Sequence, residues 1–167
     1  MTVEYEEHLL HDDGRTPNNP RLPLIVYPRA LAGGELRSEF MRRLGAGWSG
    51  AWVGGVFSYH HYHSTAHEVL CVIGGEARLE FGGEAGITLE VAAGDAVVIP
   101  AGVGHRDAGS SRDFAVIGAY PEGQSWDLLT GRPEERPQAL ENIEDVPLPA
   151  ADPVFGEEGA LAARWGL

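Results

Sequence analysis

The sequence predicts an all-β fold, a sandwich or barrel, in the middle of the chain. Between residues 51 and 119, short apolar or alternating runs follow one another and are separated by glycine-containing turns. These turns are Gly74-Gly75, Gly82-Gly83, Gly94-Asp95 and Gly109-Ser110. Short strands separated by glycine turns are typical of β-sandwiches and barrels. The length of 167 residues fits one domain with a sizeable core.

One strand and one helix are predicted ahead of the barrel. Residues 24–27 form a short apolar run with prolines on both sides, which favours an edge strand because proline cannot donate to a neighbouring strand. Between Glu35 and Leu44 the apolar residues recur at helical spacing, and Gly45 suits the C-terminal cap. We expect this helix to pack outside the barrel.

After Tyr120 the chain is rich in proline and acidic residues. The prolines at positions 147, 149 and 153 favour extended backbone, so we expect a tail that lies over the barrel or over a partner subunit. Trp165 is a candidate anchor for its end. The chain has no internal repeat, and we expect a single domain with three parts, residues 1–50 packing on the barrel, the barrel core at 51–120 and a C-terminal extension at 121–167.

Composition argues against several classes of function. The chain has 12 basic and 25 acidic residues, and its formal net charge of −13 repels nucleic-acid phosphates and anionic membrane surfaces. No apolar run reaches the roughly 20 residues of a spanning helix, and the start of the chain is acidic where a signal peptide is basic, so we expect a cytoplasmic protein. All basic residues are arginines, which excludes a Schiff-base lysine. Cys71 is the only cysteine, and its apolar neighbours favour a buried, unreactive thiol.

Two histidines and a glutamate form the first part of a predicted metal site. Side chains alternate between the two faces of a strand, so His61 and His63 can present two imidazoles to one point while Tyr62 faces away. Residues 64–66 have the composition of a hairpin turn, which would deliver Glu68 from the neighbouring strand.

A third histidine completes the predicted site. His105 follows Pro100 and Gly102, which end the apolar run at 96–99 and let the chain reverse toward the same centre. The alternative is a set of ordinary polar residues held by hydrogen bonds, but a buried carboxylate with three imidazoles is costly to desolvate without a cation. Such a set suits a divalent Mn, Fe or Ni ion and leaves up to two octahedral positions open, and Zn is a further option.

Polar residues next to these candidates have other interpretations. His60 and His67 should face away from the ligands, which favours a surface or supporting role over ligation. Tyr59 shares the parity of His61, so it is a candidate catalytic residue as a proton donor or polar wall of the cavity. The alternative for Tyr59 is an aromatic ring that only fills the barrel. Arg78 should be solvated, since its neighbours along the strand take the core face.

The spacing of these residues resembles the two sequence motifs of the cupin superfamily. The first motif is matched at every spacing by Gly55, His61, His63, Glu68 and Gly75. The second is matched by Gly94, Pro100, Ala101, Gly102 and His105. Gly109 stands where the second motif has an asparagine. The flanks at residues 13–20 and 118–123 look like those of small single-domain bacterial cupins of the YjlB type, so the resemblance spans most of the chain.

This resemblance implies the cupin double-stranded β-helix, a jelly-roll barrel, here with a short N-terminal helix and an extended C-terminal tail. It also implies that His61, His63, Glu68 and His105 bind the metal. Cupins with such ligands include dioxygenases, isomerases, decarboxylases and binding proteins, and one-barrel cupins commonly form homodimers through sheet edges.

Three functions remain open on the sequence alone. The first is a metal-dependent enzyme, an oxidoreductase of the dioxygenase type or an isomerase, that acts on a small oxygen-chelating metabolite in the barrel. The alternative is a non-catalytic cupin that binds or senses a small molecule through its metal, since the chain has no lysine, no reactive cysteine and no clearly placed general base. A metal that only stabilises the barrel is the third, and it predicts a coordinatively closed site.

Overall fold

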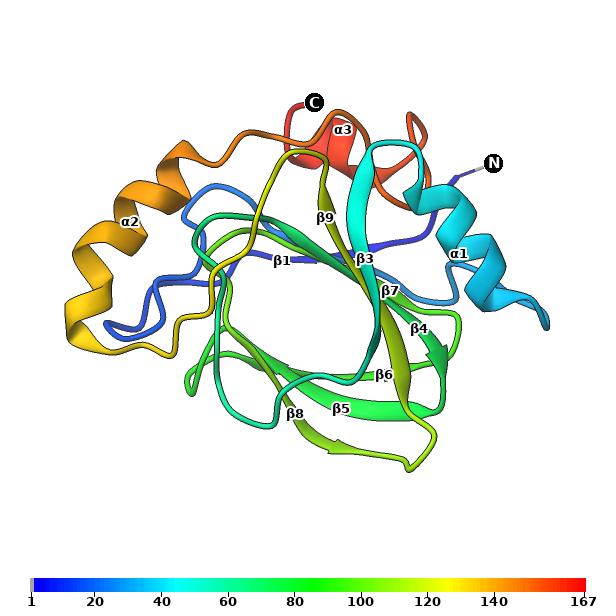
Figure 1. Ribbon diagram of the computed structural model, residues 1–167, viewed down its shortest axis with the longest axis horizontal. Coiled ribbons are helices and arrows are strands. Elements are labelled where there is room, and N and C mark those ends of the chain that lie inside the picture. Colours follow the sequence, from blue (N-terminus) through cyan, green and yellow to red (C-terminus); the bar gives the residue numbers. More distant parts are fainter. Residues whose placement is uncertain (1) are drawn as a thin grey trace.

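Two antiparallel sheets face each other and enclose a barrel in the computed structural model, which describes residues 2–167 (Figure 1). The six-stranded sheet has the order β1 (Glu6–His8), β2 (Leu24–Tyr27), β7 (Ala96–Ile99), β4 (Glu68–Gly74), β9 (Ala115–Pro121) and β3 (Trp48–Gly54). The three-stranded sheet has the order β6 (Ile87–Ala92), β5 (Glu76–Phe81) and β8 (His105–Ser110). The all-β prediction is confirmed.

The central strands of the six-stranded sheet are buried on both faces, as strand β4 illustrates. Leu70 and Val72 belong to the cluster inside the barrel, which also contains Leu79 of the facing sheet. Val69 and Cys71 point the other way, into a second cluster outside the barrel. A strand covered on both faces needs apolar residues at successive positions, which explains why β4 is a continuous apolar run and does not alternate.

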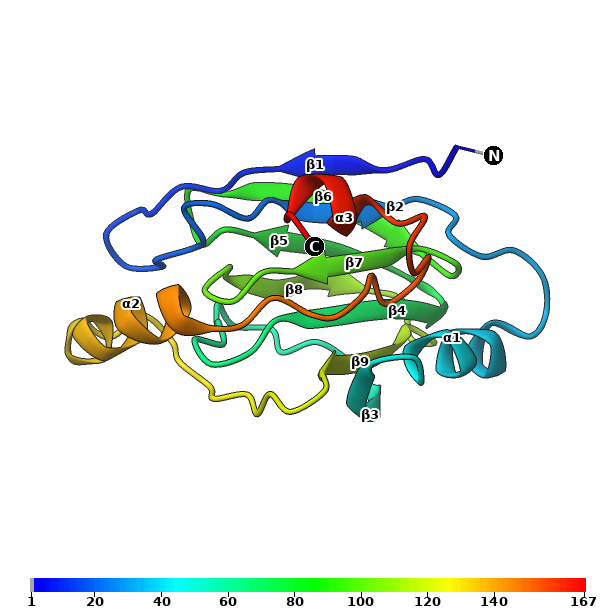
Figure 2. The same cartoon turned by 90° about the horizontal axis from the view of Figure 1, so that it is seen from above.

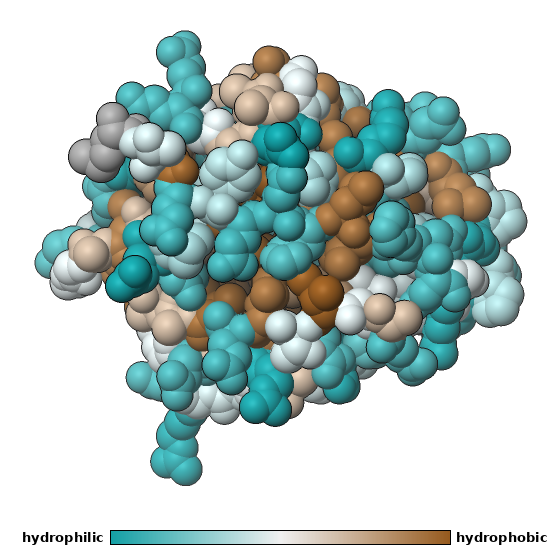
Figure 3. Space-filling view, turned by 180° about the vertical axis from the view of Figure 1, so that it is seen from behind, coloured by the Kyte–Doolittle hydropathy of each residue, from teal (hydrophilic) through white to brown (hydrophobic). Residues whose placement is uncertain are grey.

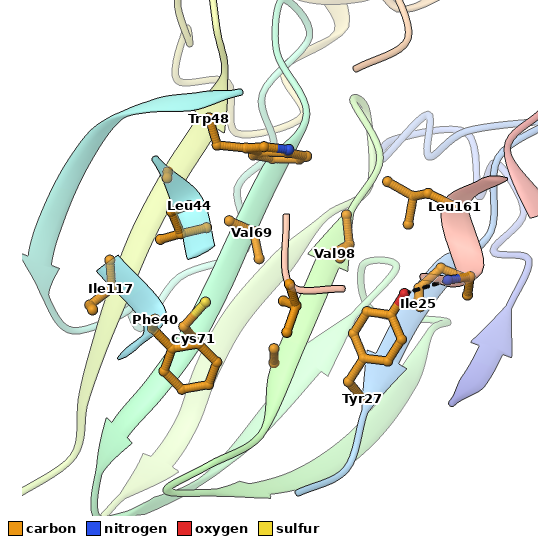
Figure 4. Close-up of a cluster of buried hydrophobic side chains, with 14 of the residues drawn as sticks. Ile25, Tyr27, Phe40, Leu44, Trp48, Val69, Cys71, Val98, Ile117 and Leu161 are labelled. Carbon is orange, nitrogen blue, oxygen red and sulfur yellow. Dashed lines mark hydrogen bonds between the residues drawn. The ribbon is translucent and has the colours of Figure 1, made fainter. Parts of the chain in front are cut away.

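Helices and the C-terminal tail cover the outer face of the six-stranded sheet. In Figure 4, Phe40 and Leu44 of α1 (Leu36–Leu44) and Leu161 of α3 (Ala160–Arg164) lie over the outward side chains of the sheet. The helix prediction for this segment is confirmed, and Gly45 is its C-terminal cap. Cys71 is buried in this cluster, and burial raises the pKa of its thiol, so the expected unreactive role is supported.

Two predictions about the flanks are wrong. Strand β2 is not at an edge, because β1 pairs with it in register from Glu6 opposite Val26 to His8 opposite Leu24. The tail is also less extended than predicted, since it forms the short η1 (Pro133–Glu135), α2 (Arg136–Asp145) and α3. A proline is tolerated in the first turn of a helix, so Pro137, the second residue of α2, does not break it.

The tail still lies over the barrel, as predicted. The buried Trp165 anchors its end, and its indole Nε1 donates to the carbonyl of Pro23 at 2.9 Å. Figure 2 shows the tail running across the strands from α2 to α3. The face behind the view of Figure 1 is mainly hydrophilic, with apolar side chains between polar ones (Figure 3). Within residues 2–167, no helix combines the length and the apolar character needed to cross a membrane.

Candidate metal centre

The first two candidate histidines lie on a segment between β3 and β4 that forms single bridges and no regular strand. His61 bridges to His105 at the start of β8, and Tyr62 bridges to Leu129 in the tail. The predicted hairpin at residues 64–66 is wrong, because this segment pairs with β8 and the tail, whereas β4 pairs with β7 and β9. The segment therefore joins the two sheets at the place where the candidate ligands meet.

The three histidines come together in a buried cluster. His61, His63 and His105 each offer one ring nitrogen, and these three nitrogens all lie within 4.8 Å of one another. Their ring centroids are 4.2 to 5.5 Å apart, and all three side chains are buried. Nitrogen atoms at this spacing can bind one metal ion between them.

Glu68, the first residue of β4, borders this cluster. Its Oε1 lies 3.1 Å from His105 Nε2 and 3.6 Å from His63 Nε2. Burial disfavours the charged carboxylate, but hydrogen bonds and charge from the two imidazoles in their protonated form outweigh burial and hold the pKa of Glu68 well below its usual range. For His61, burial and the charge of the neighbouring His105 dominate and lower its pKa to about 3.

Backbone carbonyls fix the orientation of all three imidazoles. Each Nδ1 atom lies within hydrogen-bond distance of one carbonyl oxygen, namely His61 at 3.0 Å from Tyr59, His63 at 2.5 Å from Asp127 and His105 at 3.1 Å from Val103. A carbonyl can only accept, so each Nδ1 must donate its proton. In a neutral ring the Nε2 atom then carries the free lone pair, which is the tautomer that a metal requires.

This tautomer leaves a place for a proton or a metal ion beside Glu68. With neutral rings, the lone pairs of His63 Nε2 and His105 Nε2 face a carboxylate oxygen, and no proton lies between them. Such a contact is repulsive in a buried site unless a proton or a metal ion occupies the space. Three imidazoles and one carboxylate are a donor set that suits a divalent ion. The side chains present therefore fit a metal, and the three histidines are placed to hold it.

A cavity of about 190 Å³ opens onto the histidines. Apart from the candidate ligands, its main walls are Trp52, Val56, Phe57, Leu70, Tyr120 and Trp126. The Tyr120 hydroxyl accepts a hydrogen bond from Trp52 Nε1 at 2.9 Å. Burial, and then the charge of Glu68, raise the pKa of Tyr120, so its phenol stays protonated. Tyr120 was missed in the sequence, although alternation along β9 places it on the same face as Val116, which lies inside the barrel.

A tail segment, residues 124–129, which we name the strap, is bonded to the ligand-bearing segment. Asp127 accepts from Ser64 through both carboxylate oxygens, from the backbone N at 2.6 Å and from Oγ at 2.5 Å. Thr65 Oγ1 donates to the carbonyl of Ser125 at 2.6 Å, and Gln124 accepts from the His67 backbone N at 3.1 Å. The strap thus supplies the carbonyl that orients His63 and the cavity wall Trp126.

Tyr59 lies beside a candidate ligand but does not line the cavity. Its ring packs edge to face on His61, with ring centroids 5.6 Å apart. Its side chain is 43% exposed and stacks on Phe57, with ring centroids 5.0 Å apart. It lines a separate surface pocket together with His60 and is not among the described residues that line the metal cavity. The parity argument fails for the cavity wall because residues 55–60 form no strand and do not alternate. The structure therefore favours Tyr120 over Tyr59 as the polar group of the cavity.

The two remaining histidines have different surroundings. His67 is buried away from the cavity, and its Nδ1 accepts from the backbone N of Ala101 at 2.9 Å. It therefore helps to hold the turn that leads to His105, in line with the expected supporting role. His60 is partly exposed, with its Nε2 3.5 Å from Glu80 Oε2. Arg78 is exposed on β5, as predicted.

Comparison with known proteins agrees with this architecture. A family model for the cupin domain matches residues 50–111. The chain is 48% identical, over 165 residues and 99% of both chains, to the uncharacterized protein YjlB of Bacillus subtilis (strain 168).

Two solved structures with weaker likeness show the same kind of fold and carry no argument about function. The DMSP lyase DddQ from Ruegeria pomeroyi DSS-3 has a TM-score of 0.42 and 23% identity, over 53% of this chain and 45% of that chain. A conserved protein with a double-stranded β-helix domain from Klebsiella pneumoniae has a TM-score of 0.34 and 17% identity, over 68% of this chain and 74% of that chain. On the full-length identity to YjlB and the matching cupin domain, the chain belongs to the cupin superfamily and is a YjlB-like protein.

Proposed function

We propose that the protein is a metal-dependent cupin enzyme, of the dioxygenase or isomerase type, that acts on a small oxygen-chelating metabolite held in the barrel cavity. The observation that carries this proposal is the orientation of the three imidazoles. Each Nδ1 is bonded to a carbonyl, so three Nε2 lone pairs converge beside a buried carboxylate and an open cavity. We further propose that Glu68 is the fourth ligand and that the ion is Mn, Fe or Ni, with Zn as a further option.

A divalent ion bound here would supply a Lewis acid. The protein's own residues have three tasks. The histidines and Glu68 hold the ion, and the carbonyls of Tyr59, Val103 and Asp127 hold the imidazoles. The apolar walls exclude water and confine a small bound compound next to the side chains that hold the ion. The protonated hydroxyl of Tyr120 can donate a hydrogen bond to an oxygen in the cavity.

The alternative is a non-catalytic cupin that binds or senses a small molecule. One observation favours it, which is that the cavity walls formed by described residues contain no general base besides the candidate ligands and Tyr120. A ligand that raises the melting temperature of the metal-loaded protein and is recovered unchanged would support this alternative. Turnover of any compound in a panel of oxygen-chelating metabolites would support the enzyme.

Metal content of the untagged protein tests the site itself. Plasma mass spectrometry should find close to one Mn, Fe or Ni ion per chain in the wild-type protein and none in His61→Ala or His105→Ala. His60→Ala is the matched control, because His60 adjoins His61 in sequence but points to Glu80. Failure of the wild-type protein to bind any of these ions, or Zn, after reconstitution would refute a metal-dependent function. Full metal loading without turnover of any compound would refute the enzyme but not the binding protein.

Two further expectations remain predictions. We expect a cytoplasmic homodimer that pairs through a sheet edge. The edge strands of the two sheets are β1 and β3, and β6 and β8. A monomeric mass by light scattering would contradict the dimer.

A further inference from the structure

The metal cavity has an unusual balance of charge. Glu68 is the only charged residue among the described residues that line it, and arginine is absent from its walls. Arg106 follows a candidate ligand directly in sequence, but its guanidinium binds Glu80, with Nε 2.7 Å from Oε2, and the carbonyl of Ser58. The chain contains no lysine. Within the walls, only the metal can therefore balance a negative charge on a bound compound.

The proposed ligand set limits how much charge the metal can balance. A divalent ion held by one carboxylate and three neutral imidazoles has a single net positive charge. A monoanionic chelator neutralises this centre completely. A dianion leaves one negative charge without a partner in an apolar cavity, which is costly because a buried charge needs a counter-charge or several hydrogen bonds. The site electrostatics therefore favour a single negative charge on the bound compound.

Aromatic rings from two separate segments give the cavity flat walls. Phe57 packs edge to face on His61, with centroids 5.2 Å apart and an interplanar angle of 78°. Trp126 of the strap does the same on His63, at 5.5 Å and 69°. These two side chains are 47% and 48% exposed, although large aromatic side chains gain free energy from burial. Exposed aromatic surface at the wall of a cavity is typical of a ligand-binding site.

The size of the cavity limits the ligand further. Its volume of about 190 Å³ is below the roughly 300 Å³ at which cavities for drug-sized molecules begin. There is room for a compound with one ring and few substituents, so the ligand combines a small planar body with its metal-binding oxygens.

We propose that the cavity takes small planar compounds of mainly apolar character that chelate the metal through two adjacent oxygen atoms and carry one negative charge, and that Phe57 and Trp126 select for the ring. This inference rests on the proposed metal site. The two aromatic residues contact the body of the compound, and the metal contacts its oxygens.

Three chelators separate the effects of ring and charge. Tropolone is a planar ring with two adjacent oxygens and one negative charge, acetohydroxamate has the same charge and donors without a ring, and malonate is a dianion without a ring. Calorimetry on the metal-loaded protein should give the order tropolone, acetohydroxamate, malonate, from tightest to weakest. Metal content is measured on every sample after desalting, so that removal of the metal by the chelator is detected.

Variants test the role of the two aromatic residues. Phe57→Ala and Trp126→Ala should each weaken tropolone binding by about tenfold, which corresponds to about 1.4 kcal/mol, and should change acetohydroxamate binding by less than about twofold. Leu128→Ala is the matched control, since Leu128 lies on the strap and is exposed, but does not line the cavity in the described part of the chain. It should leave the affinity for all three chelators unchanged.

Each other outcome overturns the inference in a distinct way. If the protein binds metal but takes malonate as tightly as tropolone, or if both aromatic variants lower the affinity for tropolone and acetohydroxamate equally, the assignment of ligand class is wrong while the metal site stands. If tropolone removes the metal without forming a complex with the protein, the inference is also wrong. If no metal is bound to the wild-type protein, the proposed function and this inference fail together.

Discussion

Asp127→Ala is expected to weaken both the fold and the metal site, because Asp127 joins the strap to the segment that carries His61 and His63. Its carboxylate accepts two hydrogen bonds from Ser64, at 2.6 and 2.5 Å. Its backbone carbonyl accepts from His63 Nδ1 at 2.5 Å. The substitution leaves this carbonyl in the chain but removes the side chain that fixes its position.

The magnitude follows from these bonds. A hydrogen bond to a charged group contributes about 1.5 to 3 kcal/mol. Asp127 is only half-buried, and Ser64 keeps a hydrogen bond from Asn142 at 3.0 Å. We therefore use the lower end of this energy range and expect the free energy of unfolding to fall by about 2 to 3 kcal/mol for the two bonds together. Loss of a group that orients a metal-bound histidine lowers metal affinity by roughly 10 to 100-fold. Since the carbonyl remains, we expect roughly tenfold.

Urea unfolding of the metal-free protein and competition with a chelator for the metal measure the two effects separately. Glu122→Ala is the matched control, because it removes the same charge near the strap from a side chain that is exposed. The control should change neither quantity by more than about 0.5 kcal/mol. If Asp127→Ala binds metal as tightly as the wild-type protein, or if Glu122→Ala loses as much affinity, the strap does not position His63.

Three further perturbations have defined outcomes. Burial lowers the pKa of His67 from 6.5 to about 4, so the unfolded chain binds the proton first as the pH falls. The metal-free wild-type protein should therefore lose stability progressively from pH 6.5 toward pH 4, and this group should account for about 2 kcal/mol of the loss at pH 5. In urea unfolding, His67→Asn should depend less on pH than the wild-type protein, and an equal pH dependence would contradict this. Gly118→Ala places a Cβ 2.2 Å from the Trp52 ring. This overpacking should lower the free energy of unfolding by roughly 1 to 3 kcal/mol, measured by thermal unfolding. An unchanged melting temperature would show that Trp52 can move freely. Tyr27→Phe leaves the buried Asp152 and the Ala160 amide without the hydroxyl that both contact. This should lower the free energy of unfolding by about 1 to 3 kcal/mol. An unchanged free energy of unfolding in urea would show that this contact does not hold the tail.

The local pattern of apolar residues in the sequence predicted those strands and helices that bury a regular apolar face. Apolar runs and glycine turns located the barrel strands, and the helical spacing between Glu35 and Leu44 located α1. The same rules missed β1, because Glu6–His8 is an acidic segment that gains its place through backbone pairing with β2. They also missed α2 and α3, where the density of prolines indicated extended chain although the prolines lie at or beyond helix ends.

At the site, spacing predicted which residues meet but not how they are held. The offsets between His61, His63 and His105 predicted side chains that do meet, and all three lie in the part of the chain that the cupin family model matches. The carbonyl that orients His63 lies 64 residues away, in a tail with no periodic pattern to connect it to the site. The parity rule brought Tyr59 next to His61 but not into the wall of the cavity, because the rule holds only within regular strands and residues 55–60 are irregular.

The position of the strap in the chain has a consequence for the order in which the metal centre is built. Synthesis proceeds from the N-terminus, so every candidate ligand up to His105 emerges before Asp127 and Leu129, which bond to His63 and Tyr62. A nascent chain that has reached the end of β8 has all four donors, but His63 has no fixed orientation. We expect such a chain to bind divalent ions weakly and with little selectivity, and to become selective only when the last quarter of the chain closes over the barrel. The cell's choice of metal would then be made late in folding, by residues that are not ligands.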